Sequence, residues 1–567
     1  MTSLRSIGSG TLLLLLLLVA VHLSPADGTN LHHPARRKKR DTCILSAKKR
    51  CYHVWSRTEK TCYPCKYGFG AADPHKMDLT FHVYKAGSHL GLSDVQLVDY
   101  GNPVVKKMVF TKHEFESSAR QVELHTSRDT WVIVHGFEGQ WTLPWLESMK
   151  KALLEAGNNV IVFQWTEGTS YPQGYHQAAI NIKVVGAAGA RMLRELEKVK
   201  GLDLKKTSLV GFSLGAPLVG HMGQETKGEL KQIVGLDHPS QGYSGEPVDY
   251  RLDPSDARMV QAIHTHGAPL YEGGLGTMDP VGDVDIYVNG GLKQPGCKVF
   301  GRDNFTVTDI RKMYSAIEVF GCNHLRSTFL FTDSIRNRGS SCQYTAYPCP
   351  SEYLWKRGHC VTQRVFSQGC GRNCTKLGYQ LDPSTELRGK FFLATPTMEN
   401  LRDAVYCGVQ YRLSMFPKTV EGKRIMGNIE FRLWQNGRPE AKWTHFQGTR
   451  KRIYDAGEAR MFGSKFDNPD AIELVYDRFN ALVYKGTKTW LMQQLNLIGN
   501  HGRSFLTDHP ATILEDEKMK VFLRRATSED KLLVVEPTVD AAPPLHASTG
   551  FLLAVVCATA LVLLQTV

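Results

Sequence analysis

Ser213 stands between Gly211 and Gly215 in the stretch LVGFSLGAPLVGH, where an apolar run precedes the serine and a helix-compatible run follows it. A serine on a tight turn between a strand and a helix can act as a nucleophile, because the free N–H groups of the helix N-terminus face a developing oxyanion. The Gly-x-Ser-x-Gly pattern also arises by chance in a chain of this length, so a glycine-flanked serine in a bend is the alternative. A base, an acid and two oxyanion donors must therefore be found elsewhere.

Candidate acid and base residues lie further along the chain. Asp237 ends the apolar run IVGLD, although an aspartate that only caps a turn is the alternative interpretation. Doubly wound hydrolases carry their serine, acid and histidine in this chain order. Since the chain has 21 histidines, position must select the base. His324 in GCNHLRS is preferred, because Cys322 would fix the loop that carries it and a base must hold its geometry closely. His264 and His266 are the reserve candidates.

The oxyanion of an acyl-transfer reaction needs two backbone N–H donors. One comes from the residue after the nucleophile, which is Leu214, and the other from a loop that follows an early strand. Phe137 in VIVHGFEG fits the second position, because the apolar run ends in His-Gly and the chain can turn its N–H inward there. We therefore expect Phe137 and Leu214 to form the oxyanion hole.

These residues lie at the ends of predicted strands. From about Thr130 onward, short apolar runs alternate with helical stretches, which predicts βαβ units and a mostly parallel sheet. The expected strands are TWVIV (130–134), NVIVFQW (159–165), TSLVG (207–211), QIVGL (232–236) and MVQAIHT (259–265), and one long helix covers 177–200. Ser213 therefore follows a predicted strand and begins a predicted helix, as the tight turn requires.

The hydrophobic pattern of the sequence changes after about Pro383. Runs such as YCGVQYRLSMF, GNIEFRLWQNG and AIELVYDRFNALVYKG alternate without a helical period and predict an antiparallel β-sandwich. Five cysteines crowd between the two regions: Cys342, Cys349, Cys360, Cys370 and Cys374. We expect disulfides there rather than a large core, and the competing zinc site is disfavoured by the signals for secretion at the chain ends.

Composition and the N-terminus indicate a secreted globular protein. With 567 residues, 42% of them hydrophobic, the chain can form two domains and is not disordered. Residues 1–28 carry one arginine, a leucine-rich block and small residues, which is typical of a signal peptide rather than a membrane span. The basic run 36–40 predicts a furin-type site that ends a propeptide at 29–40, with an anion-binding arm as the alternative. Cleavage there removes six basic residues and one acidic residue, so the formal charge falls from +14 to +9.

The C-terminal segment 531–567 predicts a linker and a glycosylphosphatidylinositol (GPI) attachment signal. A small triplet DAA, the spacer PPLHASTG and the apolar tail 551–567 follow in the order of that signal. A short transmembrane helix is the alternative, and it would be marginal in length. The odd one of 13 cysteines, Cys557, lies in this tail, which leaves an even number for disulfides. Sequons at Asn304 and Asn373 fit the same secretory route.

Together, these stretches resemble the pancreatic lipase family of secreted lipases. The matching stretches are VIVHGF, LVGFSLGAP, IVGLD, YRLDPSDARMVQAIHT, VDIYVNGGLKQPGC and CNHLRS, in family order over roughly 95–335. The resemblance implies an α/β-hydrolase catalytic domain with a mostly parallel central sheet at 41–385 and a PLAT-type β-sandwich at 386–530, beginning near GKFFLATPT. It also implies that Ser213, Asp237 and His324 form the catalytic triad.

The resemblance further implies a lid. Cys297 and Cys322 match the family's lid disulfide, which leaves 298–321 as a loop that can swing while its feet stay fixed. The loop is rich in apolar residues, which would cover the site in water and face lipid when opened. Lids of full length go with triacylglycerol lipases in this family, and shortened lids with phospholipases.

A structural calcium loop is implied by RLDPSDA. Asp253 and Asp256 would supply carboxylate ligands, and Val248 and Arg251 would supply backbone carbonyls, which are hard ligands that suit calcium. The alternative is that these aspartates only cap a turn. No cofactor is expected for the chemistry itself. Phe212 stands where pancreatic members have histidine, and its side chain is not expected to take part in catalysis.

The resemblance implies a secreted or cell-surface lipase that hydrolyses the carboxylic esters of glycerolipids, with triacylglycerol favoured. Its partner would be a lipid droplet, a lipoprotein or a membrane lipid surface, and no nucleic acid partner is expected. The alternatives are a phospholipase A1 and a catalytically silent ectodomain that binds lipid or heparan sulfate. Basic clusters at 48–50 and 450–452 could bind heparan sulfate, although such runs are more often solvated faces.

Overall fold

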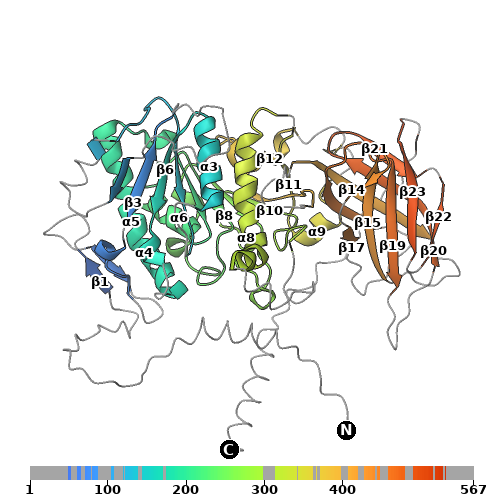
Figure 1. Cartoon of the computed structure of the whole chain (residues 1–567), viewed down its shortest axis with the longest axis horizontal. Helices are drawn as coiled ribbons and strands as arrows, with labels where there is room; N and C mark the ends of the chain where they lie inside the picture. The colour runs from blue at the N-terminus through green and yellow to red at the C-terminus, as the bar shows by residue number, and fades with distance from the viewer. Residues whose placement is uncertain are drawn as a thin grey trace, which may run out of the picture. The chain divides into compact units, whose positions relative to one another are not determined.

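The computed structural model of the chain contains two large sheets and a small two-stranded hairpin (Figure 1). The described residues are 49–52, 61–64, 70–77, 79–86, 104–107, 119–120, 122–137, 143–169, 174–297, 313–340, 342–361, 365–366, 371–397, 407–418, 427–440, 443–446, 458–478, 489–507, 509–514, 517–527 and 530. The expected signal peptide 1–28, propeptide 29–40 and tail 531–567 lie outside them, as does the basic cluster 450–452.

The first region is an eleven-stranded sheet in the order β12-β11-β13-β10-β9-β8-β7-β5-β6-β3-β4. Its strands are β3 (Thr80–Tyr84), β4 (Val104–Lys107), β5 (Thr130–Val134), β6 (Asn159–Gln164), β7 (Thr207–Phe212), β8 (Gln232–Leu236), β9 (Val260–His264), β10 (Val284–Val288), β11 (Thr345–Pro348), β12 (Thr375–Lys376) and β13 (Gly389–Leu393). The strands from β6 to β13 in this order pair in parallel, and antiparallel strands lie at both edges. The carboxyl ends of β5, β7, β8 and β9 therefore meet at one edge of the sheet.

Helices or short 3-10 turns separate the parallel strands in sequence. They are α3 (Pro144–Glu155), α4 (Thr166–Thr169), α5 (Gly174–Lys200), α6 (Gly215–Glu225), α8 (Met313–Arg336) and α9 (Glu352–Lys356). Short 3-10 turns are η1 (Pro74–Lys76), η2 (Leu204–Lys206), η3 (Val248–Tyr250), η4 (Pro254–Asp256), η5 (Leu270–Glu272), η6 (Gly371–Asn373) and η7 (Gly378–Gln380). The predicted helix 177–200 is thus three residues longer at its start, and the expected strands at 130–134 and 232–236 are confirmed.

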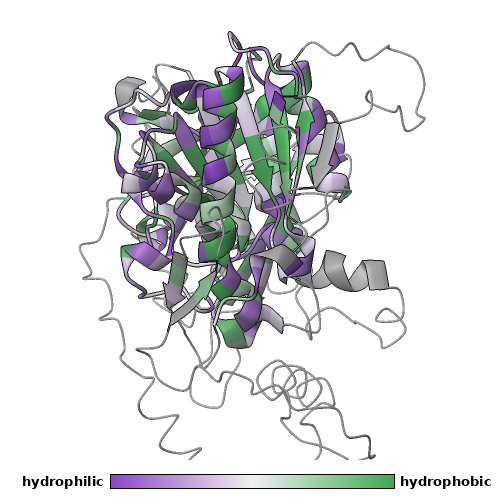
Figure 2. Ribbon diagram, turned by 90° about the vertical axis from the view of Figure 1, so that its left-hand side faces the viewer, coloured by the Kyte–Doolittle hydropathy of each residue, from purple (hydrophilic) through white to green (hydrophobic). Residues whose placement is uncertain are grey.

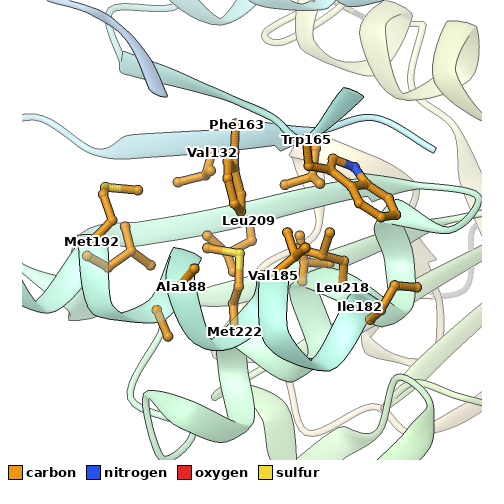
Figure 3. Packing of buried hydrophobic residues seen from close by; sticks show 14 of the residues in the cluster. Val132, Phe163, Trp165, Ile182, Val185, Ala188, Met192, Leu209, Leu218 and Met222 are labelled. Carbon is orange, nitrogen blue, oxygen red and sulfur yellow. The ribbon is translucent and has the colours of Figure 1, made fainter. Parts of the chain in front are cut away.

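Alternate residues of each central strand enter two separate cores. Val132 and Leu209 belong to the core that includes residues of α5 and α6, whereas Ile133 and Val210 belong to the core that includes residues of α3 and α8. The period of two in a strand produces this division, because successive side chains leave opposite faces of the sheet. Figure 3 shows Leu209 of β7 among side chains of α5 and α6. The sheet is therefore covered on both faces, as its apolar strands require.

The hydropathy pattern agrees with this layering. Figure 2 shows hydrophobic residues concentrated along strands, whereas the helices carry both hydrophobic and hydrophilic residues. α5 buries a stripe that includes Ile180, Val184 and Ala188 and places lysines in its last turn. Within the described residues, none of the helices combines the length and the apolar character needed to cross a bilayer.

The second region is a ten-stranded antiparallel sheet system in the order β16-β15-β19-β23-β21-β20-β14-β18, with β17 beside β15 and β22 beside β20. Its strands are β14 (Val409–Lys418), β15 (Gly427–Gln435), β16 (Arg438–Pro439), β17 (Thr444–Phe446), β18 (Glu458–Ser464), β19 (Ala471–Arg478), β20 (Thr489–Gly499), β21 (Ser504–Thr507), β22 (Ala511–Leu514) and β23 (Lys518–Arg525). Alternate residues such as Phe431 and Leu433 are buried in one shared core, which fits the predicted β-sandwich.

The predicted start of the sandwich at 386 is wrong. β13 (Gly389–Leu393) pairs in parallel with β10 and belongs to the first sheet, and the antiparallel strands begin at Val409. Phe391 and Leu393 belong to the core that includes residues of α3 and α8, so the apolar run FFL is the last parallel strand of the first sheet. Sequence texture could not separate the two regions there, because a short apolar run fits either kind of sheet.

Disulfides hold the cysteine-rich regions. The described pairs join Cys51 to Cys62, Cys297 to Cys322, Cys342 to Cys407 and Cys349 to Cys360. The first pair links a small hairpin of β1 (Lys49–Tyr52) and β2 (Thr61–Pro64). Cys374 is also disulfide-bonded. The expected disulfides therefore replace the competing zinc interpretation at these positions.

Candidate active site

Ser213 lies on the turn between β7 and α6, in a backbone conformation that few residues other than glycine adopt. Its φ is +55°, and its N–H donates to the Leu236 carbonyl over 2.9 Å. A Cβ added at Gly211 would lie 2.1 Å from the Gly215 carbonyl oxygen, and one added at Gly215 would lie 2.5 Å from the Val134 oxygen. Both glycines are therefore required by close backbone approach, and such strained turns mark functional sites.

Asp237 follows β8 directly and also has a positive φ, of +49°. Its Oδ1 accepts hydrogen bonds from the Thr265 and His266 backbone N–H groups over 2.8 and 3.0 Å, and its Oδ2 accepts one from His324 Nδ1 over 2.5 Å. Burial acts to raise the pKa of this carboxyl, but the hydrogen bond and charge of His324, helped by His266 and the Thr265 N–H, outweigh it and lower the pKa. Asp237 is therefore held as a carboxylate that is hydrogen-bonded to the His324 imidazole.

His324 lies within α8 and not on a loop, which corrects the sequence-based expectation. Cys322, two residues earlier in the same helix, is joined to Cys297, so the disulfide anchors a helix instead of a loop. A helix fixes a side chain through its own backbone hydrogen bonds, which meets the need for rigid geometry more directly. His324 is 7% exposed, so its ring is nearly enclosed.

Phe212 brings the imidazole beside the nucleophile turn. Its ring centroid lies 4.6 Å from that of His324 and 5.3 Å from that of Trp145. Since Phe212 directly precedes Ser213, this contact holds His324 next to the serine. Within the described part of the chain, the Ser213 hydroxyl makes no hydrogen bond to the imidazole, and such bonds are often long before substrate binds.

The loop after β5 carries Phe137 and approaches the serine. A Cβ added at Gly136 would lie 2.8 Å from Ser213 Cβ and 3.3 Å from its Oγ, so only a glycine fits between this loop and the serine. Phe137 packs edge-on against Tyr175 of α5, with centroids 5.6 Å apart. Leu214 precedes the first residue of α6, whose first N–H groups have no carbonyl partner within the helix. Gly136, which precedes Phe137, and Leu214 thus lie on either side of Ser213, and the oxyanion hole stays a prediction.

The two reserve candidates for the base, His264 and His266, differ in their distance from the proposed triad. His264 is fully buried and bonds both to the Thr277 carbonyl over 2.8 Å and to Asp285 over 2.9 Å, away from the serine turn. His266 lies two residues beyond the end of β9, with its ring centroid 6.3 Å from that of His324. Burial is the main reason that the pKa of His266 falls to about 4. The closeness of His266 to Asp237 was missed, although its place after a strand next to β8 was a usable signal.

The candidate calcium loop holds a carboxylate oxygen without a partner. Asp256 is fully buried, its Oδ2 accepts the Asp253 N–H over 2.9 Å, and its Oδ1 has no hydrogen bond. Burial raises the pKa of Asp256 to about 8. Asp253 caps η4 through the Ser255 N–H, as the turn-capping alternative expected. The orphaned oxygen fits a cation, so the residues at Val248, Arg251, Asp253 and Asp256 are compatible with calcium.

Other predicted features are described only in part. Most of the expected lid 298–321 lies outside the described residues. Its last part belongs to α8, which begins at Met313, and of this part only the backbone is described up to residue 320. Asn304 also lies outside them, whereas Asn373 ends η6 and is exposed. The sequon at Asn373 is therefore accessible, and glycosylation at Asn373 and at Asn304 stays a prediction.

Comparisons with known proteins place the chain in a family. The family model described as Lipase matches residues 61–401. Pancreatic triacylglycerol lipase of Homo sapiens is 30% identical over 407 residues, which cover 70% of this chain and 83% of that relative. Inactive pancreatic lipase-related protein 1 of Mus musculus is 32% identical, covering 70% and 76%, and Lipase member H of Rattus norvegicus is 27% identical, covering 82% and 94%. The chain therefore belongs to the Lipase family, that of the pancreatic lipases, with an α/β-hydrolase fold.

Proposed function

We propose that this protein is a secreted lipase that hydrolyses carboxylic esters of glycerolipids, triacylglycerol above all, through Ser213, His324 and Asp237. The observation that carries the proposal is the strained Ser213 turn beside the buried His324–Asp237 pair. A serine hydroxyl is a weak nucleophile, and it needs an adjacent base oriented by an acid. The three side chains supply these parts in the chain order of α/β-hydrolases.

In the proposed reaction, the Ser213 hydroxyl attacks the ester carbonyl carbon while its proton passes to His324 Nε2. Asp237 holds the proton on His324 Nδ1 and stabilises the imidazolium that forms. The backbone N–H groups of Phe137 and Leu214 stabilise the oxyanion, and loss of one such donor costs about 3 kcal/mol in the barrier. The alcohol then leaves with the proton from His324, and water hydrolyses the acyl-enzyme by the same route.

The test is a substrate panel on the purified secreted protein, with Ser213→Ala as the inactive variant and Ser208→Ala as its control. Ser208 lies on the same strand β7, is buried, and its Oγ has no hydrogen bond, so its loss should leave turnover intact. We expect triolein to be hydrolysed faster than phosphatidylcholine, and Ser213→Ala to abolish both reactions. A preference for phosphatidylcholine would favour a phospholipase A1, and hydrolysis that persists in Ser213→Ala would overturn the triad.

A catalytically silent binding protein is the second candidate. The similarity to Inactive pancreatic lipase-related protein 1 favours it, since that relative is inactive by name. Such an ectodomain would bind lipid or heparan sulfate equally well with or without the Ser213 hydroxyl. Equal and negligible ester hydrolysis by the native protein and Ser213→Ala, together with retained lipid binding, would establish this alternative.

We also propose extracellular localisation with a GPI anchor and a PLAT-type sandwich that meets the lipid surface. The exposed Asn373 and the disulfides support a secretory route. Release of the native protein from cells by a phosphatidylinositol-specific phospholipase would support the anchor, and retention of all protein on the membrane would favour the short transmembrane helix.

Calcium is proposed as a structural ion at Asp253 and Asp256, with the Val248 and Arg251 carbonyls. The ion would neutralise the orphaned Asp256 oxygen and brace the turn next to α6, and it takes no part in ester chemistry. Saturating calcium at about 100 times its dissociation constant should stabilise the fold by about 2.7 kcal/mol. Thermal unfolding in calcium and in chelator, for the native protein and for Asp256→Asn, tests this.

A further inference from the structure

A second imidazole lies at the proposed triad. Asp237, His266 and His324 each offer a ligand atom, and these atoms lie within 4.8 Å of one another. The three side chains are 0%, 4% and 7% exposed, so they form an enclosed cluster rather than a surface group. Elsewhere among the described residues, no other group of three or more acidic, histidine or cysteine side chains gathers as closely.

The proposed ester reaction does not use the His266 side chain. Its backbone N–H is fixed to Asp237 Oδ1 over 3.0 Å, and its Nδ1 is buried without a hydrogen-bond partner in the described structure. A buried polar nitrogen without a partner carries a desolvation cost, and in native proteins such a group calls for an explanation. A ligand that accepts the nitrogen lone pair would remove that cost.

Two imidazoles and one carboxylate match the preference of a transition-metal ion. Zn²⁺ binds histidine nitrogen and aspartate oxygen, often with three protein ligands and one open position, whereas Ca²⁺ and Mg²⁺ prefer oxygen ligands alone. We propose that Asp237, His266 and His324 form a zinc-binding site, and that zinc bound there blocks the nucleophile turn. His266 is the residue that distinguishes this site from an ordinary serine hydrolase triad.

Zinc binding and ester hydrolysis exclude each other in this arrangement. The proposed reaction needs Nδ1 of His324 to donate to Asp237 and its other nitrogen to accept the Ser213 proton. A metal ion on either nitrogen removes one of these functions. The inhibition therefore rests on the proposed function, whereas zinc binding does not.

The experiment separates the two claims. Zinc chloride is titrated by calorimetry into the full secreted chain with calcium present. Two proteins are compared: the Ser213→Ala variant, which keeps all three ligands, and the double variant that carries Ser213→Ala and His266→Gln. The control carries His125→Gln, which removes an exposed histidine outside the cluster. We expect His266→Gln to weaken the zinc affinity by more than about tenfold, because even an outer-shell partner contributes that much, and His125→Gln to leave it unchanged.

Equal zinc affinity with and without His266, or no zinc binding at all, would overturn the site whatever the enzyme does. In the active protein, micromolar zinc should inhibit hydrolysis of a soluble ester while equal magnesium does not, and His266→Gln should relieve the inhibition relative to its own zinc-free rate. If His266→Gln fails to fold, the site is tested by anomalous scattering at the zinc edge from crystals of the unmodified protein. A peak beside His266 and His324 supports the site, and a peak only elsewhere refutes it.

Discussion

Two buried histidine–aspartate pairs lie in the same sheet region, and their surroundings differ. His324 and Asp237 meet beyond the end of β8, whereas His264 and Asp285 meet between β9 and β10. The His264 ring forms a hydrogen bond through each of its nitrogens, one with the Thr277 carbonyl and one with Asp285. The ring also stacks on Tyr287, with centroids 4.4 Å apart. Neither nitrogen of the His264 ring is therefore left open beside a nucleophile.

The His324 ring is held on one side only. Its Nδ1 donates to Asp237, and within the described residues its other nitrogen has no hydrogen-bond partner. The Ser213 turn lies beside this ring, because Phe212, the residue before the serine, contacts it. The comparison teaches that a histidine–aspartate pair becomes a proton relay only when one nitrogen is left open beside a nucleophile. A fully bonded pair is a structural link between strands.

Replacing each of the two aspartates by asparagine should give the largest effects, and the two variants should differ in whether activity or stability is lost. Asp237→Asn should lower kcat by about 10⁴-fold with little loss of fold, because the imidazole loses its correct tautomer. Asp285→Asn should lower the free energy of unfolding by about 1–3 kcal/mol and leave the rate per folded molecule unchanged, since a buried hydrogen-bonded charge is lost away from the site. Esterase kinetics and urea unfolding measure both quantities. Similar kcat losses in both variants would break the comparison.

Matched glycine substitutions beside each pair should have a smaller effect. A Cβ at Gly276 would lie 2.5 Å from Asp237 Oδ1, and one at Gly282 would lie 2.8 Å from the Val260 carbonyl oxygen, next to Asp285. Gly276→Ala should displace the carboxylate and lower kcat by about 10²-fold, the typical result of a 1 Å misplacement. Gly282→Ala should lower the melting temperature without changing kcat per folded molecule. An unchanged kcat in Gly276→Ala would show that the Asp237 position is not critical.

The smallest effect per residue is expected for the pH dependence of stability, to which each buried neutral histidine contributes. Mainly through burial, three histidines outside both pairs and outside the proposed zinc site have pKa values lowered from 6.5 to about 4, 4 and 3: His135, His221 and His238. The unfolded chain binds these protons near pH 6.5, and the folded chain does not bind them until about pH 4. Stability should therefore fall as pH drops from about 6.5 to about 4, by at most about 1.4 kcal/mol per pH unit for each histidine.

Urea unfolding between pH 7 and pH 5 measures this dependence of the unfolding free energy on pH. The variant His221→Gln should reduce the slope by up to the contribution of one proton, about 1.4 kcal/mol per pH unit. Asp256 acts in the opposite direction when no cation is bound, because its raised pKa of about 8 makes the folded chain bind a proton that the unfolded chain releases. The measurement is therefore made in calcium. An identical slope in His221→Gln would contradict a neutral buried His221.

Strand positions and the serine turn could be predicted from sequence. The strands at 130–134 and 232–236 are continuous apolar runs bounded by polar residues, and such runs carry their own signal. Their carboxyl ends place Phe137 and Asp237 near Ser213 because parallel strands share an edge.

The remainder depends on contacts distant in sequence. Nothing local distinguished β13 at Gly389–Leu393 from a sandwich strand, because its partner β10 lies about a hundred residues earlier. His324 was expected on a loop, whereas it lies within α8, two residues after the cysteine that is joined to Cys297. The contact of His266 with Asp237 likewise depends on how β8 and β9 pair.

The most direct test of the central claim is covalent labelling of the native secreted protein with a fluorophosphonate ester, followed by peptide mapping. The reagent reacts with a serine only when a neighbouring base activates it. We predict a single adduct on Ser213, which is lost in Ser213→Ala and in His324→Ala but retained in Asp285→Asn. A folded native protein that gains no adduct, or one that labels equally without His324, would contradict the account.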